Sequence, residues 1–301
     1  MSNQPTLSTP RGACRVRWPS RAAAQALRAA AVAASVALTS LFAVSCATSG
    51  VNSGDFNLIS VDEEWQLGAQ LENDINKQVK LVRSGRAADY LERVGRAIVD
   101  QTELGDRPWT FHLVDDPAIN AFNIPGGHVY VNTGLVEAAP DAAAFAGVLA
   151  HEIAHGVARH GTEQLTKSYG INILGGVLLG QNPAVYEQIL AQVLAGGAIA
   201  RFSRAAENEA DELGVRYSYE SGYDPMGLPR MLQVIAREAQ REPGKIEQFF
   251  ATHPMTENRI EATQQMASSL EGGRRNERAR ARRRSARRGG VSRARAAPSR
   301  G

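Results

Sequence analysis

The sequence predicts a mainly α protein with a small β-sheet, an α+β fold. Between residues 58 and 270 most apolar side chains recur at helical spacing, and only two short stretches alternate as strands do. A hydrophobic fraction of 43% in a chain of 301 residues is enough to build a buried core. We therefore expect one folded domain over residues 58–270.

The two ends of the chain differ in charge from its centre. Residues 1–46 contain five arginines and no acidic residue, and residues 271–301 contain twelve arginines and two glutamates. The net charge of +3 therefore hides an acidic central region. We expect residues 271–301 to be a disordered Arg-rich tail, because they offer almost nothing apolar to bury. The tail lacks aromatic residues, so we expect no specific nucleic-acid partner. The alternatives are a solvated tail with no specific partner, which we favour, and contact with anionic lipid or lipopolysaccharide.

The N-terminal segment has the pattern of an export signal. An apolar run over residues 29–44 follows the basic leader and is too short for a typical membrane span. It ends at Ser45-Cys46, which resembles the lipobox of bacterial lipoproteins. We predict a lipoprotein signal peptide over residues 1–45, lipidation of Cys46 and a flexible tether over residues 46–57. The lipid would hold the protein on the periplasmic face of the outer rather than the inner membrane, unless Cys46 is incidental to an ordinary cleaved signal.

The folded region begins with two predicted helices and two predicted strands. The first helix starts near Ser60, and a turn near Ser84-Gly85 separates it from the second. Alternating side chains predict strands over Trp109–Val114 and His128–Val131. Residues 119–127 between them are rich in turn formers, so we expect a bend there.

A central helix is predicted to run from its N-cap, Asp141, to about His160. It carries the pattern H-E-x-x-H, in which His151 and His155 lie on one helix face about one turn apart. That spacing lets both imidazoles bind one zinc ion. Glu152 would then act as the general base that takes a proton from water at the zinc. The alternative is a surface helix that carries an ordinary glutamate and two histidines.

Glu207 and Asp211 form a second pair at i and i+4, on a later helix. One of these carboxylates can complete the zinc site, and the other can accept the spare N–H of a zinc-bound imidazole. Both cysteines, Cys14 and Cys46, precede the folded domain, so its ligands must be His, Asp or Glu. The alternative for this pair is a solvent-exposed acidic helix start.

Three further histidines lie on predicted elements without a metal-type partner in the sequence. His112 and His128 fall on the strands, and His160 is turned off the face that carries His151 and His155. We expect structural roles for the first two, and a structural role or a contact with a zinc ligand for the third.

Two apolar stretches, residues 171–180 and 189–200, separate the two halves of the expected site. Each is too short and too rich in glycine to span a bilayer, so we expect a helical hairpin. The sequence leaves open whether this hairpin packs on the core or dips toward lipid. Farther on, His253 precedes Pro254, which favours extended geometry in a loop before a last helix over residues 256–270.

These motifs, in this order, resemble the zinc metallopeptidases of the HtpX/BepA type, which also include the CAAX prenyl proteases. The resemblance covers roughly residues 58–268. It rests on Asn120-Ala121-Phe122 with Pro125-Gly126-Gly127, on Val148–His155, on Ser203-Arg204 with Glu207–Asp211, on Gly222–Pro225, and on Thr252-His253-Pro254 with Arg259. It implies a zincin-like (gluzincin) metallopeptidase domain with an active-site helix, an edge strand and a helical hairpin insertion.

The resemblance also implies roles for single residues. His151, His155 and Glu207 would bind one Zn²⁺ per chain, and Asp211 would orient a ligand. His253 and Arg259 would lie near the metal, as groups that stabilise the oxyanion or gate the site. The edge strand that pairs with an extended substrate would consist of Gly127, His128, Val129 and Tyr130.

The expected function is zinc-dependent cleavage of periplasmic or outer-membrane proteins, misfolded ones above all. Long transmembrane segments and a tetratricopeptide array are missing, so the resemblance is to a lipoprotein-like periplasmic member of the group. A periplasmic chaperone or assembly factor with a latent or structural zinc site is the alternative. The intact Glu152 argues against it, since a structural site needs no base.

Overall fold

The computed structural model describes residues 51, 57, 59–196, 201–255 and 258–273. The expected signal peptide, Cys46, most of the tether and the tail beyond residue 273 lie outside this part and stay predictions. The helices are α2 (Val61–Gln78), α3 (Arg86–Val99), α4 (Thr133–Ala138), α5 (Ala142–Val157), α6 (His160–Tyr169), α7 (Ile171–Leu178), α8 (Pro183–Gly196), α9 (Arg204–Glu220), α10 (Gly227–Arg241) and α11 (Pro243–Thr252). Residues 259–273 form a further helix.

The described sheet has three strands, β1 (Thr110–Val114), β2 (Ala121–Ile124) and β3 (His128–Asn132), in the order β1-β3-β2. β1 runs parallel to β3, and β2 runs antiparallel to it. The strands predicted around β1 and β3 are confirmed. The bend expected over residues 119–127 is wrong in its centre, where β2 lies. This strand has only four residues and ends directly before Pro125-Gly126, so turn formers hide its alternation.

The prediction that Gly127–Val131 forms the edge of the sheet is also wrong. β3 is the central strand, and Tyr130 lies opposite His112 of β1 on one side and Phe122 of β2 on the other. All five residues of β3 are buried. The backbone of β3 therefore forms hydrogen bonds with a strand on each side. Among the described strands, β2 and β1 are the two edges of the sheet.

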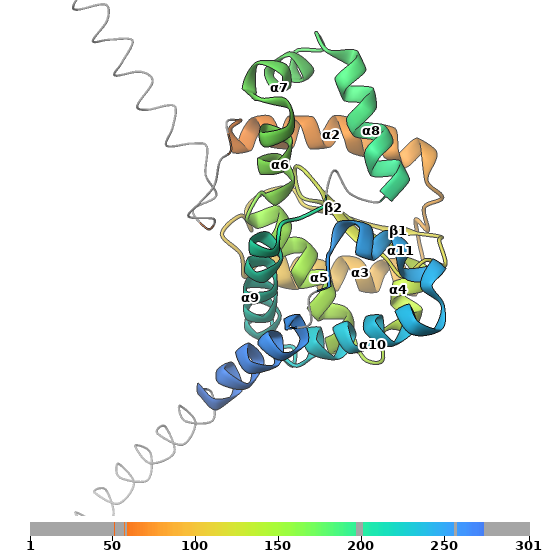
Figure 1. The fold of residues 1–301 in the computed structure, drawn as a ribbon, viewed down its shortest axis with the longest axis vertical. Helices are drawn as coiled ribbons and strands as arrows, with labels where there is room; N and C mark the ends of the chain where they lie inside the picture. Colours follow the sequence, from red (N-terminus) through yellow and green to blue (C-terminus); the bar gives the residue numbers. More distant parts are fainter. Residues whose placement is uncertain (1–50, 52–56, 58, 197–200, 256–257, 274–301) are drawn as a thin grey trace, which may run out of the picture. The chain divides into compact units, whose positions relative to one another are not determined.

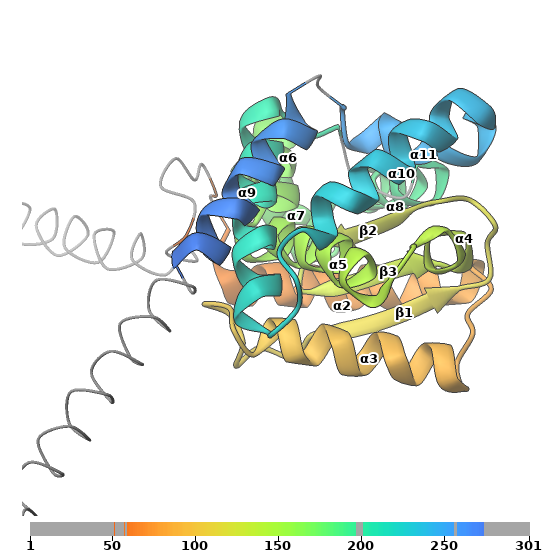
Figure 2. The same ribbon diagram turned by 90° about the horizontal axis from the view of Figure 1, so that it is seen from below.

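Helices cover both faces of the sheet. Val129 and Val131 of β3 face one core, shared with α3, α5, α9 and α10, whereas Tyr130 faces a second core, shared with α2, α7 and α8. Figures 1 and 2 show this arrangement, with α5 and α3 on one side of the strands and α2 with the hairpin on the other. The alternation along β3 follows from the two-residue period of a strand.

The active-site helix begins as predicted and ends earlier than predicted. The carboxylate of Asp141 accepts a hydrogen bond from the backbone N–H of Ala144 at 2.8 Å and caps α5. The helix stops at Val157 because Arg159 adopts a left-handed conformation, with φ of 59°. The buried guanidinium of Arg159 pairs with Glu64 of α2, which holds it in this conformation. α6 then starts in a new direction at His160.

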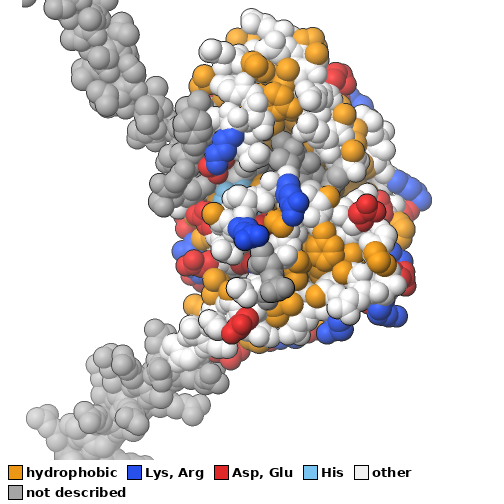
Figure 3. Space-filling model, viewed as in Figure 1, with side chains coloured by type: hydrophobic (Ala, Val, Ile, Leu, Met, Phe, Trp, Pro, Cys, Tyr) orange, Lys and Arg blue, Asp and Glu red, His pale blue; other side chains and the backbone are white. Residues whose placement is uncertain are grey.

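The hairpin expected after α6 is confirmed as α7 and α8, which pack together and against α2. Leu174 and Val177 of α7 and Ile189 and Val193 of α8 enter the second core. Figure 3 shows mostly apolar and neutral atoms at this end of the molecule. The hairpin therefore packs on the core, and its outer side remains exposed.

Candidate metal centre

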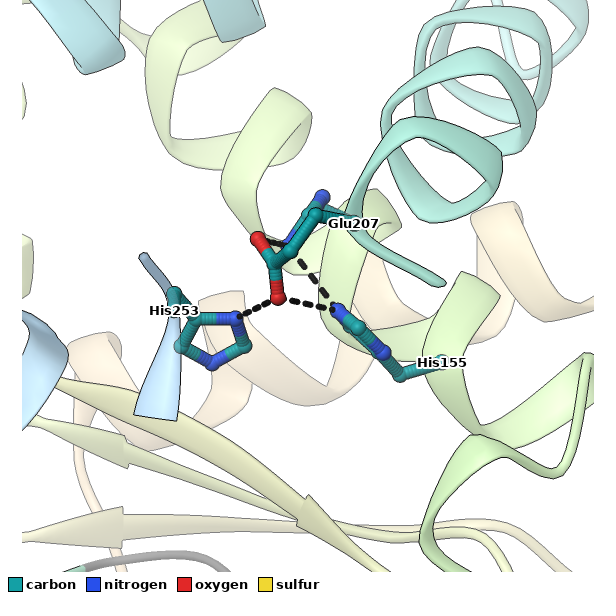
Figure 4. Close-up of side chains that lie close together, drawn as sticks. His155, Glu207 and His253 are labelled. Atoms are coloured by element: carbon teal, nitrogen blue, oxygen red, sulfur yellow. Dashed lines mark hydrogen bonds and ion pairs between the residues drawn. The ribbon is translucent and has the colours of Figure 1, made fainter. Parts of the chain in front are cut away.

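His151 and His155 lie on consecutive turns of α5, and Glu207 reaches them from the first turn of α9. The Nε2 atoms of the two histidines are 3.1 Å apart, and Glu207 oxygens lie 3.7 Å from His151 Nε2 and 3.4 Å from His155 Nε2. Figure 4 shows the Glu207 carboxylate between the rings of His155 and His253. α9 packs closely on α5 because Gly214 lets its backbone approach His151, with room for no side chain.

A second set of contacts fixes the orientation of both rings. Nδ1 of His151 lies 3.0 Å from Asp211 Oδ1, and Nδ1 of His155 lies 2.9 Å from Nδ1 of His160. His160 is in turn 3.3 Å from Glu209. Because each Nδ1 lies against another polar side chain, each Nε2 is the ring nitrogen that faces Glu207. The sequence prediction for His160 was a structural role or a contact with a zinc ligand, and the structure places its ring against that of His155.

Arg259 joins the two carboxylates of α9. Its guanidinium donates to both oxygens of Asp211, at 2.8 and 2.7 Å, and lies 2.6 Å from Glu207 Oε2. Burial raises the pKa of Asp211, but Arg259 and His151 outweigh burial and lower it. Burial likewise acts against the charge of Glu207, yet His253 and His155 lower its pKa well below the usual range. Both carboxylates are therefore anionic near neutral pH.

Glu152 is the buried acid of the site that makes no hydrogen bond to the described residues. Its side chain is fully buried, and neither carboxylate oxygen has a hydrogen-bond partner among the described residues. Burial raises its pKa, an effect that the nearby His253 and His151 partly offset. A carboxylate that is desolvated and free of hydrogen bonds is suited to exchange a proton with a molecule that enters the site.

His253 closes the site from the opposite side. It is the C-cap residue of α11 with extended backbone, as the following proline predicts. Its Nδ1 lies 3.0 Å from Glu207 Oε1, and its Nε2 lies 3.4 Å from Glu152 Oε1 (Figure 4). Burial lowers the pKa of His253, but Glu207 and Glu152 outweigh burial and raise it. His253 thus offers a ring nitrogen as a fourth possible ligand beside His151, His155 and Glu207. One ligand atom from each of these four residues lies within 4.8 Å of the other three.

The donor set fits a zinc ion. Four ligands at about 2.1 Å in a tetrahedron lie about 3.4 Å apart. The two Nε2 atoms are 3.1 Å apart, and each lies 3.4 or 3.7 Å from one of the two carboxylate oxygens of Glu207. Two imidazoles and one carboxylate form a set that catalytic zinc sites use, with a further position left for water or substrate. The buried, unpartnered oxygens of Glu152 next to this set also point to a missing polar group.

The small sheet, the active-site helix and this site define a metallopeptidase with a zincin-like fold. A sequence profile described as Peptidase family M48 matches residues 86–267. The chain belongs to this family, whose members are zinc metallopeptidases.

The curated relatives are longer proteins. The beta-barrel assembly-enhancing protease of Escherichia coli K12 is 28% identical over 225 residues, which cover 70% of this chain and 45% of that protein. The protein of the same name from Yersinia pestis is 28% identical over 221 residues, with the same coverage. The mitochondrial metalloendopeptidase OMA1 of Schizosaccharomyces pombe is 29% identical over 208 residues, which cover 68% of this chain and 61% of that protein. The chain thus spans about half the length of the bacterial relatives.

A second histidine cluster was missed at the level of sequence. Glu72 Oε1 lies 2.7 Å from His112 Nε2 and 3.2 Å from His128 Nδ1, and it accepts a hydrogen bond from Thr110 at 2.8 Å. The structural roles predicted for both histidines agree with these contacts. Their partner could not be found by pattern, because Glu72 lies on α2 and is 40 residues from His112 in the chain.

Proposed function

We propose that this chain is a zinc-dependent endopeptidase that cleaves periplasmic or outer-membrane proteins, misfolded ones in particular. The observation that carries the proposal is the convergence of His151, His155 and Glu207 beside Glu152, a buried carboxylate without a hydrogen-bond partner among the described residues. The names of the bacterial relatives, which refer to β-barrel assembly, support substrates connected with that process. A signal peptide with lipidated Cys46 would bring the domain to the membrane where such substrates occur.

The roles of the residues follow from their contacts. Bound by His151, His155 and Glu207, a zinc ion would polarise the scissile carbonyl and lower the pKa of water. Glu152 would accept the proton of the attacking water, since it is desolvated and makes no hydrogen bond to the described residues, and would deliver it to the leaving amine. Asp211 would hold the ring of His151, and His253 would donate to the oxygen that gains negative charge. Arg259 would keep both α9 carboxylates ionised.

An extended substrate would pair with β2 in place of β3. β2 is antiparallel to β3 and packs against α5, the helix that carries His151 and His155. Asn123 of β2 approaches Gly156, the residue after His155, and its Nδ2 is buried without a hydrogen-bond partner among the described residues. A substrate that adds to the edge of a sheet is held mainly by hydrogen bonds to its backbone, so we expect loose selectivity for its sequence.

The proposal is tested with Glu152→Gln in the full chain. We expect this variant to bind zinc with the same stoichiometry as the wild type and to cleave an unfolded outer-membrane protein about 10²–10⁴ times more slowly. Glu137→Gln, a change at an exposed residue away from the site, is the matched control. Full turnover by Glu152→Gln, or loss of zinc together with turnover, would contradict the assigned role.

A latent enzyme is the second candidate, and two observations favour it. His253 contacts both Glu207 and Glu152, and none of the metal-centre residues described above exposes more than 2% of its surface as a whole residue. In this alternative His253 keeps the site closed until a partner or substrate moves it, and the protein acts mainly as a chaperone or assembly factor. His253→Ala separates the candidates, because turnover rises above that of the wild type if His253 is a latch and falls if it is a catalytic donor.

A further inference from the structure

The outer side of the helical hairpin has no part in the proposed peptidase site. Three large apolar side chains are exposed in the described part of the chain, namely Ile171 (44%), Ile173 (39%) and Leu179 (73%). All three lie on α7 or directly after it. Leu174 and Val177 on the opposite side of α7 are buried. The helix is thus apolar on both sides, whereas a surface helix normally has one polar face.

The hairpin also has only one charged side chain. Glu187 is the one residue with a charged side chain between residues 171 and 196, in a domain that is otherwise rich in ion pairs. In Figure 3 the end of the molecule that carries α7 and α8 shows mostly orange and white atoms, with red and blue atoms at its right-hand margin. The polar residues near the exposed apolar ones are uncharged, for example Asn172 and Gln181. Burying such a surface is favourable in free energy, and the surface has almost no charge with which to attract a charged partner.

The rest of the domain holds this surface in place. The hydroxyl of Tyr186 on α8 donates to Asp74 of α2 at 2.7 Å, and Ile189 and Val193 pack in the core that α2 shares with the sheet. The exposed side of α7 is therefore presented by a fixed scaffold.

The hairpin is too short to cross a membrane. α7 and α8 have 8 and 14 residues, which correspond to about 12 and 21 Å, against about 30 Å for the hydrocarbon core of a bilayer. Within the described ranges no helix is both long and apolar enough for a span. A short apolar helix pair on a soluble scaffold suits the interfacial layer of a membrane.

We propose that the exposed side of α7 and the turn between α7 and α8 insert into the interfacial layer of a phospholipid bilayer. The contact is hydrophobic and requires no anionic lipid, because the hairpin has no basic side chain. This docking goes beyond the proposed peptidase activity and rests on it only for the location at a membrane. It would add a second, orienting contact to the single anchor expected at Cys46, since one acyl anchor alone leaves a domain free to rotate.

The test is depth-dependent fluorescence quenching. Leu179→Trp in the full chain adds an indole at the most exposed apolar position, and the protein is bound to phosphatidylcholine vesicles with brominated acyl chains. We expect the emission that the new indole adds to fall about twofold or more, because it enters the acyl region. Gln240→Trp, at an exposed position on α10, is the matched control and should show no added quenching. The wild type supplies the background of its three tryptophans.

Salt identifies the nature of the contact. The quenching at position 179 should persist in about 1 M NaCl, where the Debye length falls to about 3 Å. Quenching no greater at position 179 than at position 240, or quenching that salt abolishes, would overturn the proposal in favour of a protein partner or of adsorption through the Arg-rich tail. Cleavage of an unfolded protein by the same variants confirms their folding. Absence of cleavage in the wild type as well would contradict the peptidase proposal and leave the quenching result valid.

Discussion

Oδ1 of Asp211 lies 3.0 Å from Nδ1 of His151, and Arg259 holds the other side of the same carboxylate. This contact fixes the ring nitrogen that faces Glu207. Asp211→Asn should therefore weaken zinc binding about 10–100-fold, because the amide is a poorer acceptor and leaves the imidazole less basic. Competition with a chromophoric chelator measures the change. Glu212→Gln, an exposed neighbour on α9, should keep the wild-type affinity, and an equal loss in both variants would refute the role of Asp211.

The buried ion pair between Arg159 and Glu64, at the end of α5, should make a large contribution to the free energy of unfolding. Both side chains are almost fully buried, and Arg159 also donates to the carbonyl of Ile59 at 2.8 Å. Arg159→Met should lower the free energy of unfolding by about 3–5 kcal/mol, because it leaves the charge of Glu64 buried and unpaired. The double variant with Glu64→Leu should recover much of this loss in denaturant titrations. Equal destabilisation of the single and double variants would show that the cost has another origin.

Two helical glycines should respond to alanine in opposite directions. A Cβ on Gly147 of α5 would lie 2.4 Å from the backbone nitrogen of Leu228, whereas a Cβ on Gly175 of α7 would meet nothing within 4 Å. We expect Gly147→Ala to lower the free energy of unfolding by about 1–3 kcal/mol, since α5 and α10 must move apart. Gly175→Ala should raise it by about 0.5–1 kcal/mol through helix propensity. Chemical denaturation of both variants gives the comparison, and a gain from Gly147→Ala would contradict the close approach of the two helices.

Glu72 should make stability depend on pH. Burial raises the pKa of its carboxyl group, but hydrogen bonds with His112 and His128 outweigh burial and hold the pKa well below the ordinary 4.5. A depressed folded-state pKa stabilises the protein fully above the unfolded value, and this contribution is lost as the pH falls toward the folded value. Glu72→Gln should thus cost about 1.5–3 kcal/mol at pH 7.

The difference between wild type and Glu72→Gln should shrink below about pH 4.5, as the wild-type carboxylate loses its advantage. Unfolding free energies measured from pH 7 to pH 3 give this curve, with Glu137→Gln as the control at an exposed glutamate. A difference that stays constant over the whole range would rule out the carboxylate as its source.

Local periodicity was sufficient to predict the parts of the site that share a helix. His151 and His155 meet because residues at i and i+4 lie on one face, and the same rule joins Glu207 and Asp211. The capping of α5 by Asp141 and the extended backbone of His253 follow from side chains within a few residues. These features need no information from the rest of the fold.

Tertiary packing decided how these parts combine. α9 returns to α5 only after α6 and the hairpin, so the contact of Glu207 with His155 depends on which faces bury together. Strand order is equally nonlocal, which is why the sequence predicts a bend at β2 and an edge strand at β3. The sequence by itself therefore determined the zinc-binding residue types and the helices that carry them. Only the folded structure showed that β2 and not β3 lies at the edge of the described sheet, that Arg159 pairs with Glu64, and that Glu72 meets His112 and His128. Each of these depends on contacts between residues far apart in the chain.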